Sequence, residues 1–437
     1  MTGRPRRSVL AGCGAGLAAL AGCSADLGTD GDEEREYDAG ALGDVVEGRE
    51  TPTRPETFPV GVPETMLDRH YGRARELVGA VPERPAVPNG AVAERLRERR
   101  TRVVRDLEER PDAATGPERL AAARRIRGSA AEVNGAYRAA VGELDRDSVA
   151  GNRRALRADV HGFRGGWTYR GGDPARALVV HAELEGLLRT ARQRAEAWPP
   201  FPEAPRRDVF RAGEVLGNLS EGWAAFADAG RLRTRYLAGV PDPASYRSAA
   251  TAAAHRLGRR ASMARRRLDE YPELPAPEAF ERAVEGTPAA RLYERARRGT
   301  EHAAGDVDSA RRGGEHATAT LEGARGLASV GASRAAIDAI EAGEYGPPED
   351  AGPVAAAREA AVTALREAWA TEPVPVSAEV AEPAREALVS GDVRLEETDG
   401  EAYEVDDALA AFGYARLYAE AVSDAVTAVL AAVEGEG

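Results

Sequence analysis

Lysine does not occur in this sequence, so arginine supplies all 59 basic side chains. A lysine amine is needed to bind phosphate in a P-loop, to form the Schiff base of a pyridoxal phosphate enzyme or aldolase, and to act in a Ser-Lys dyad. Arginine cannot replace it, because the guanidinium stays protonated. The absence of lysine therefore excludes these classes of enzyme.

Cysteine is almost as scarce, since Cys13 and Cys23 are the only two. Beyond Cys23 the chain has no thiol for a cysteine protease, a disulfide, or a Cys-ligated zinc or iron-sulfur site. The patterns His-Glu-x-x-His and Glu-x-x-His are also absent, which removes the zincin and ferritin-like di-iron families. We predict no catalytic residue and expect a non-enzymatic protein.

The composition is acidic and poor in isoleucine. Acidic side chains number 72, the net charge is -13, and isoleucine occurs only at positions 126, 337 and 340. An acidic surface keeps a protein soluble and disfavours nonspecific binding to nucleic acid, so we expect no nucleic-acid partner. With the missing lysine, this composition resembles that of proteins from salt-adapted, high-GC organisms, first of all haloarchaea, with a high-GC actinobacterium as the alternative.

Residues 1–22 have the pattern of an export signal. Arg6 and Arg7 precede an apolar run over residues 9–20, which are the basic start and apolar core of a secretory leader. The paired arginines followed by Ser-Val-Leu resemble the twin-arginine signal, whose cargo usually crosses the membrane folded. We therefore expect an extracytoplasmic protein.

The tetrapeptide Leu-Ala-Gly-Cys occurs twice, ending at Cys13 and at Cys23. The apolar run before Cys13 is too short for a leader, so cleavage is expected before Cys23. The second tetrapeptide resembles a lipobox, in which the cysteine thiol receives a lipid. The resemblance implies a lipid anchor at Cys23 on the outer face of the cytoplasmic membrane, with an uncleaved short anchor or a lipid-free secreted form as the alternatives.

Residues 23–60 are rich in Gly, Asp, Glu and Pro and have few large apolar side chains. Such a segment buries too little surface to offset its ordering entropy, so we expect a flexible acidic stalk. The alternative is a tail packed on the body through Tyr37, Leu42 and the pair Val45-Val46.

The rest of the chain has the pattern of an all-α body, a helical bundle or an irregular helical array. Apolar residues recur every three or four positions, most clearly over residues 405–430. Because so long a body exceeds the usual size of one core, we expect one helical lobe over residues 61–271 and a second over 272–437. One continuous array is the alternative.

Helix starts and surface pairs support this prediction. Thr115 and Glu118 have capping-box spacing, and Asp-Pro pairs at 173–174 and 242–243 combine a capping carboxylate with a proline suited to a first helical turn. Acid-first pairs four residues apart predict solvated helix faces. They are Glu98/Arg102, Asp106/Arg110, Glu185/Arg189 and Glu294/Arg298.

One β-hairpin is predicted, at about residues 392–404. Val393, Leu395 and Tyr403 alternate with polar residues around Asp399-Gly400, a pair typical of a type I′ turn.

The loop at residues 161–174 combines four aromatic or histidine side chains with five glycines. Rigid aromatic side chains on such a loop suit a ligand or partner surface. The alternative is that they fill the helical core. The residues are His161, Phe163, Trp167 and Tyr169.

Acidic side chains and histidines gather at residues 301–316, where helical spacing puts His302 and Asp306 on one face. A divalent metal bound by His302, Asp306, Asp308 and His316 is one interpretation, and a solvated charged turn is the other. Apart from this metal ion, no cofactor is expected.

Two further sequence features have functional and structural interpretations. The sequon at Asn218 suits glycosylation of an exported chain or occurs there by chance. The arginines at 259, 260 and 265–267 suit phosphates or an anionic headgroup, or else form salt bridges with neighbouring acidic faces.

These observations predict a lipid-anchored binding or scaffold module on the cell surface, similar to exported haloarchaeal lipoproteins. Its partner would be a protein, an envelope component or a small ligand. The alternative is a metal-binding or metal-dependent envelope protein that uses the cluster around His302 and His316.

Overall fold

The computed structural model describes residues 35–110, 115–196, 200–268 and 280–435. Within these ranges the chain is an all-α array of helices, as the periodicity predicts, and the sheet they contain is a single antiparallel pair of two-residue strands. Residues 36–437 form one compact unit. Arg6, Arg7, Cys13 and Cys23 lie outside the described residues.

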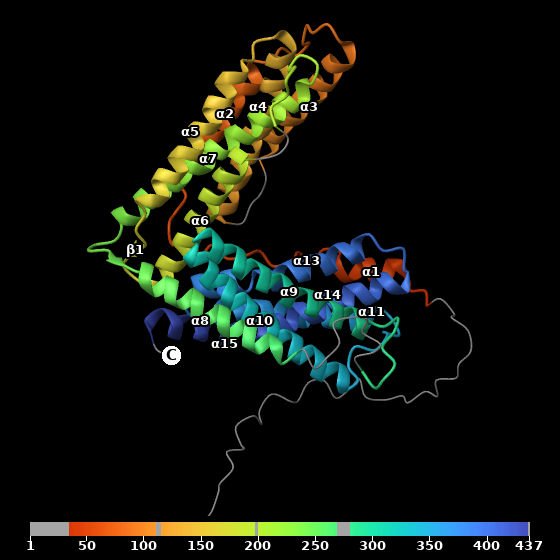
Figure 1. The fold of residues 1–437 in the computed structure, drawn as a ribbon. Helices are drawn as coiled ribbons and strands as arrows, with labels where there is room; N and C mark the ends of the chain where they lie inside the picture. The colour runs from red at the N-terminus through yellow and green to blue at the C-terminus, as the bar shows by residue number, and fades with distance from the viewer. Residues whose placement is uncertain (1–34, 111–114, 197–199, 269–279, 436–437) are drawn as a thin grey trace, which may run out of the picture. The chain divides into compact units, whose positions relative to one another are not determined.

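The first group of helices is formed by residues 60–240, which share one hydrophobic core (Figure 1). Its core consists mainly of Leu, Val and Ala side chains from each amphipathic helix. The helices are α2 (Glu64–Gly79), α3 (Gly90–Glu109), α4 (Gly116–Val141), α5 (Arg146–Gly165), α6 (Pro174–Glu196) and α7 (Val209–Ala238).

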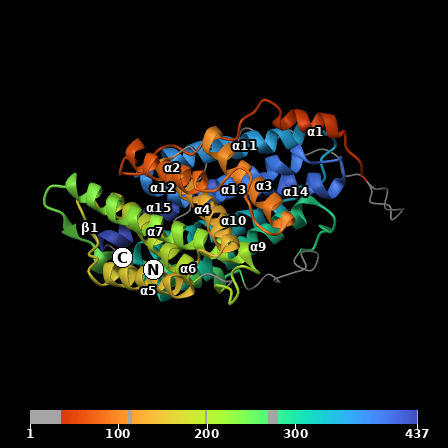
Figure 2. The same cartoon turned by 90° about the horizontal axis from the view of Figure 1, so that it is seen from above.

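The second group packs around α10 (His316–Glu341), whose side chains are mostly buried, and Figures 1 and 2 show this group in two views. The buried side chains of α10 are mostly Ala, Gly, Ser and Thr, so neighbouring helices approach it closely on several faces. The other helices are α8 (Arg247–Arg266), α9 (Pro288–Gly313), α11 (Ala351–Ala370), α12 (Val374–Val380), α13 (Glu382–Glu396), α14 (Ala402–Glu420) and α15 (Val422–Glu434).

Glycines bring α4 and α7 into direct backbone contact. A methyl group at Gly213 of α7 would lie 2.4 Å from the carbonyl oxygen of Glu132 in α4, and one at Gly217 would lie 2.9 Å from the carbonyl oxygen of Gly128. No side chain fits at such distances. The absence of a side chain at these positions therefore sets the spacing of the two helices.

The second half of the predicted stalk is folded. Helix α1 (Ala39–Val46) buries Leu42, Val45 and Val46, and Thr51 donates a hydrogen bond to Asp392 at 2.6 Å. The prediction of a flexible stalk is wrong for residues 36–60, because these few apolar side chains pack against α11 and α13. The alternative, a packed tail, describes this part of the chain.

The predicted hairpin at 392–404 is also wrong. Residues up to Glu396 continue α13, and Asp399-Gly400 joins α13 to α14 with Gly400 at φ 92°. The alternation was misleading because Val393 and Tyr403 are exposed, whereas Leu395 faces a helical core. The strands lie elsewhere, where β1 (Arg170–Gly171) pairs with β2 (Ala244–Ser245).

The helices divide between α7 and α8, before the boundary expected at residue 271. Helix α8 packs on α9, α10 and α15 and so belongs to the second group. Packing of the small-residue face of α8 on α10 decides the grouping.

The predicted helix starts have mixed outcomes. The capping box of Thr115 and Glu118 is confirmed, and Asp173 accepts a hydrogen bond from the Arg176 amide at 2.8 Å. The cap predicted at Asp242 is wrong, because strand β2 intervenes before α8. The stripe at 405–430 lies on α14 and α15, which are separated at Ala421.

Substituting Gly213 with alanine should lower the free energy of unfolding by about 1–3 kcal/mol, because α4 and α7 must separate to admit the methyl group. The control is Gly230→Ala in the same helix, where no atom lies within 4 Å of the added carbon. That variant should be more stable by about 0.5–1 kcal/mol. Denaturant unfolding at constant salt measures both, and a neutral Gly213→Ala would contradict the close packing.

Candidate functional site

A buried polar joint connects the two groups of helices. We define it by Trp167, Tyr169, His181 and Glu185, with the N-terminus of α10. The rings of Trp167 and Tyr169 stack with centroids 4.9 Å apart, and the ring of His181 lies beside both. The Trp167 indole N–H donates to His181 Nδ1 at 3.2 Å, and His181 Nε2 lies 3.1 Å from the carbonyl oxygen of Arg170. These partners require a neutral imidazole with its proton on Nε2.

Glu185 lies one turn after His181 on α6 and is 1% exposed. Its Oε1 accepts hydrogen bonds from the Tyr169 hydroxyl at 2.5 Å and the Ala317 amide at 3.1 Å, and its Oε2 accepts from the Thr318 amide at 2.6 Å. Both amides belong to the first turn of α10, where a helix has no internal acceptor for them. Glu185 thus caps α10 from another helix, in place of a local N-cap side chain.

A second bond across the joint joins Arg189 of α6 to Glu315, at 2.5 Å, just before α10. Arg164 of α5 donates to the carbonyl oxygen of Gly313, at the end of α9. The predicted surface pair Glu185/Arg189 is wrong, because Glu185 binds the first turn of α10 and Arg189 binds Glu315. Of the other predicted pairs, Glu294/Arg298 forms, at 3.7 Å.

Burial controls the electrostatics of the joint. It raises the pKa of Glu185 to about 7, although the hydrogen bonds from Tyr169, Ala317 and Thr318 oppose this shift. Burial also lowers the pKa of His181 to about 4, against the effect of the Arg170 carbonyl. Burial and the neighbouring Glu185 raise the pKa of Tyr169. Near neutral pH the joint therefore contains a neutral imidazole and a carboxyl group close to its midpoint of titration.

The aromatic side chains predicted as a ligand loop are part of this joint. Trp167 and Tyr169 are buried, and Phe163 packs edge-on against Trp167 and Phe226. His161 is exposed on α5, which extends to Gly165. The structure thus corresponds to the alternative, in which these aromatic side chains fill the helical core.

A buried cluster around Asp228 has no local sequence signature. His70 Nε2 of α2 lies 3.0 Å from Asp228 Oδ2 of α7, and Arg124 of α4 donates to the same oxygen at 3.2 Å. Their spacing along the chain exceeds any helical period, so sequence analysis could not pair them. Since His70 and Asp228 are both 0% exposed, a substrate cannot reach them, and the cluster joins three helices.

A groove of about 850 Å³ lies between α9, α10, α13 and α14. Tyr403, which lines the groove, is 53% exposed. Tyr414 packs closely on α9, because a methyl group at Gly299 would lie only 2.3 Å from the Tyr414 hydroxyl. Most of the lining is charged, with both signs represented. The charged residues are Arg291, Glu294, Arg295, Arg298, Asp306, Glu322, Arg325, Glu382, Glu386, Arg394, Glu404 and Asp407.

Ion pairs order most of this lining. Arg295 and Arg394 both contact Asp407, at 3.5 and 3.2 Å, and Arg325 contacts Glu322 at 2.7 Å. Glu386 forms no ion pair with any described residue, and burial together with Glu382 raises its pKa. The groove therefore presents fixed charges of both signs, and Glu386 is among the lining carboxylates that form no ion pair with a described residue.

The residues proposed for a metal site are not brought together. His302 and Asp306 line the groove, Asp308 lines a different pocket, and the ring of His316 lies 5.9 Å from that of Tyr169. In the described parts of the chain, no three His, Cys, Asp or Glu side chains are arranged to hold a metal ion. The arrangement does not support the cluster hypothesis.

The sequon residue Asn218 lies in the middle of α7 and is half-buried. Its Oδ1 accepts a hydrogen bond from Arg194 at 3.0 Å. Glycan acceptors typically lie in surface loops, so this placement disfavours modification.

Among the described residues, none of the helices has the length and apolar character needed to span a bilayer.

Two family models match the chain. A model described as "Domain of unknown function (DUF8262)" matches residues 65–242, and one described as "Domain of unknown function (DUF8264)" matches residues 247–431. The first match covers α2 to α7 and the second covers α8 to most of α15. No curated protein and no solved structure matches the chain. The joint thus connects the two matched segments, with Glu185 in the first and α10 in the second.

The pKa values of Glu185 and His181 predict opposite pH effects on stability. From pH 4.5 to 7 the folded state retains a proton on Glu185 that the unfolded chain releases, so this contribution to stability falls as pH rises. Relative to Glu185→Gln, the wild type should lose about 3 kcal/mol of unfolding free energy over this window. Denaturant unfolding at a series of pH values measures the difference.

His181→Gln is the matched control with the opposite sign. From pH 4 to 6.5 the unfolded chain holds a proton that folded His181 has released, so this contribution rises with pH. The wild type should gain about 3 kcal/mol relative to His181→Gln over this window. If the two differences had the same sign, the assigned protonation states would be wrong.

Proposed function

We propose that this protein is a lipid-anchored, extracytoplasmic binding module without catalytic activity, and that the groove between α9, α10, α13 and α14 is its ligand site. The observation that carries the proposal is the groove, a cavity of about 850 Å³ lined by side chains from four helices. This volume falls within the range of ligand sites in proteins. Its ion pairs hold the lining in place before a ligand arrives, which lowers the entropy cost of binding.

The lining favours a polar partner that carries both charges, and we propose a polypeptide segment of another envelope protein. Arginine forks suit the carboxylates of such a segment. Glu386, without an ion pair among described residues, suits a cationic group. Tyr403 at the edge offers an exposed aromatic surface of the kind enriched in binding sites.

The location is supported by the order of signals in the sequence. Arg6 and Arg7 begin the export signal and Cys23 ends the lipobox. A lipid on Cys23 would hold the groove at the outer face of the cytoplasmic membrane.

Cys23→Ser should release the protein from the membrane fraction, because the thiol that accepts the lipid is lost. Cys13→Ser is the matched control, since that residue leaves with the signal, and it should fractionate as the wild type does. Cell fractionation and incorporation of a labelled lipid measure the outcome. A Cys23→Ser protein that stayed lipid-labelled would disprove the anchor.

A photo-cross-linking amino acid at Ser390, which lines the groove, should capture a partner polypeptide on intact cells. Val393 on the same helix is 42% exposed and does not line the groove, so the same probe there is the control. We expect adducts from position 390 several times more abundant than from 393, identified by mass spectrometry. Equal adducts from both positions, or none from 390, would remove the groove from the proposal.

A further inference from the structure

Residues 243–268, most of them in α8, carry no acidic side chain although the chain has a net charge of -13. In the part of the chain that the structure describes, no arginine of this segment forms an ion pair with an acidic side chain, and Arg256 instead donates to the carbonyl oxygen of Ala432. Salt bridging to neighbouring acidic faces, one interpretation of the sequence, is therefore not found among the described residues, and the adjoining Asp269 and Glu270 lie outside them. The arginines are Arg247, Arg256, Arg259, Arg260, Arg265, Arg266 and Arg267.

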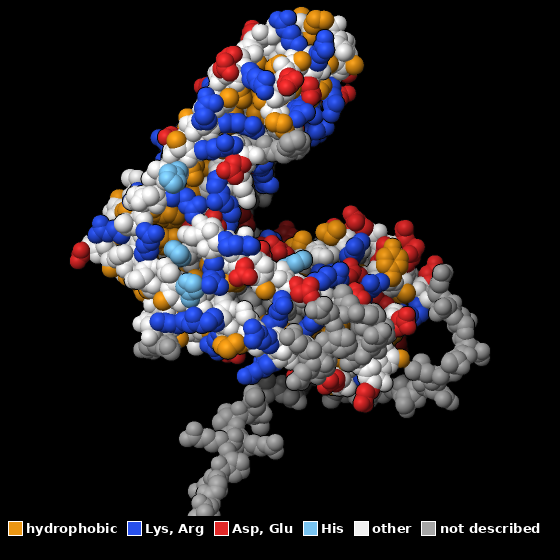
Figure 3. Space-filling view, viewed as in Figure 1, with side chains coloured by type: hydrophobic (Ala, Val, Ile, Leu, Met, Phe, Trp, Pro, Cys, Tyr) orange, Lys and Arg blue, Asp and Glu red, His pale blue; other side chains and the backbone are white. Residues whose placement is uncertain are grey.

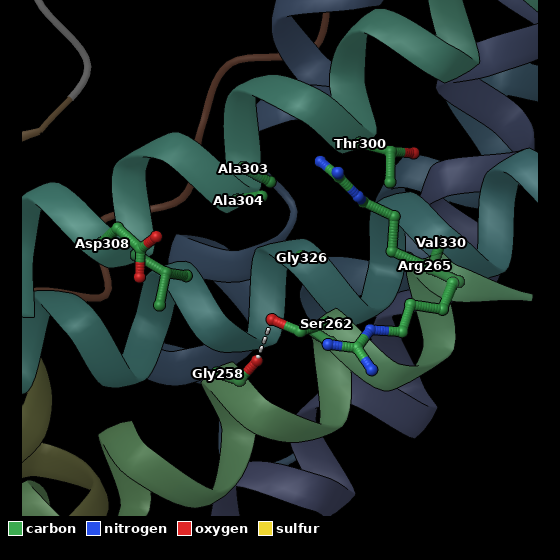
Figure 4. A pocket seen from close by; sticks show the side chains of 12 residues that line it. Gly258, Ser262, Arg265, Thr300, Ala303, Ala304, Asp308, Gly326 and Val330 are labelled. Atoms are coloured by element: carbon green, nitrogen blue, oxygen red, sulfur yellow. Dashed lines mark hydrogen bonds between the residues drawn. The ribbon is translucent and has the colours of Figure 1, made fainter. Parts of the chain in front are cut away.

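The C-terminal half of α8 forms one wall of a pocket of about 360 Å³, which α9 and α10 complete (Figure 4). Its lining consists mostly of small residues: Gly258, Ala261, Ser262, Thr300, Ala303, Ala304, Val307, Gly326 and Val330. A methyl group at Gly258 would lie 3.2 Å from Val307, and one at Gly326 would lie 3.3 Å from Ala261. The small side chains therefore keep the pocket open.

Arg265 and Arg266 complete the lining, and Figure 4 shows arginine side chains from the end of α8 extending over the pocket. Asp308 on α9 is the acidic residue of the lining, and it pairs with Arg311 at 3.7 Å. The pocket thus combines an interior of small side chains with two guanidinium groups that no described carboxylate occupies. Figure 3 shows acidic and basic side chains intermixed over the face it views, in contrast with the acid-free α8.

We propose that this pocket binds a phosphate group, either free or as the headgroup of a lipid, with Arg265 and Arg266 as its ligands. Guanidinium groups bind phosphate oxygens through paired hydrogen bonds, and two of them match the charge of a phosphate dianion. Neither arginine has to break an ion pair with a described residue before it binds phosphate. The small interior accommodates the part of the ligand next to the phosphate. This site is separate from the groove and does not depend on the function proposed for it.

The salt dependence of binding distinguishes a pocket site from a diffuse basic surface. In about 1 M salt, charges are screened beyond about 3 Å, so attraction to the exposed face of α8 is lost. Groups in direct contact within a pocket are screened much less. A phosphate ligand of this pocket should therefore remain bound in molar KCl.

The test uses the full-length chain in about 1 M KCl and titration calorimetry with two probes, inorganic phosphate and water-soluble dihexanoyl phosphatidic acid. Binding of both with similar affinity indicates a free-phosphate site. Tighter binding of the phosphatidic acid indicates a lipid headgroup with its glycerol part in the pocket. Failure of both probes to bind overturns the proposal.

Matched variants locate the site. The double variant Arg265→Gln, Arg266→Gln should weaken binding about tenfold or more. The double variant Arg259→Gln, Arg260→Gln makes the same charge change on the same helix outside the pocket, and should change binding less than twofold. Equal losses from both would assign binding to the general charge of α8 and overturn the pocket site.

A pocket-filling variant covers the case in which the first double variant does not fold. Ala304 lines the pocket from α9 and is half-buried, so Ala304→Leu narrows the interior while keeping every arginine. It should weaken binding of phosphatidic acid about tenfold, and unchanged binding of both probes would exclude this pocket.

Discussion

The placement of one carboxylate, Glu185, against the first turn of α10 is the constraint on which the arrangement of the helices depends. Helix α10 is buried on several faces and begins in the interior, where water cannot satisfy its first amides. Glu185 supplies the missing acceptor from α6, and Arg189 supplies a cation for Glu315 beside it. The cost of burying these polar groups is met only when both groups of helices are in contact.

The position of α10 in turn determines both candidate sites. Arg325 and Ser329 face the groove from one side of α10, and Gly326 and Val330 line the small pocket from another. Helix α9 separates these sites, with His302 and Asp306 toward the groove and Asp308 toward the pocket. A shift of the α10 N-terminus at the joint would therefore alter both linings together.

Charge is distributed differently at the two sites although all basic side chains are arginine. In the groove, arginines such as Arg295 and Arg394 share Asp407, so charges are neutralised and oriented. On α8, arginines meet no acidic partner among the described residues. The same residue type thus shapes a mixed-charge groove in one place and an anion-binding pocket in another, and the acidic neighbours make the difference.

The sequence by itself determined the helical class, the stripe at residues 405–430 and caps such as Thr115 with Glu118, because these depend on neighbours within a few residues. It could not determine the role of Glu185, whose spacing to Arg189 indicated a surface pair, because the α10 amides that Glu185 caps lie more than a hundred residues away. It misassigned residues 392–404 for a related reason, since alternation does not reveal which face a helix buries. Only the tertiary structure decided the joint, the groove and the pocket, because each is made by side chains from helices that are distant in sequence and adjacent only after packing.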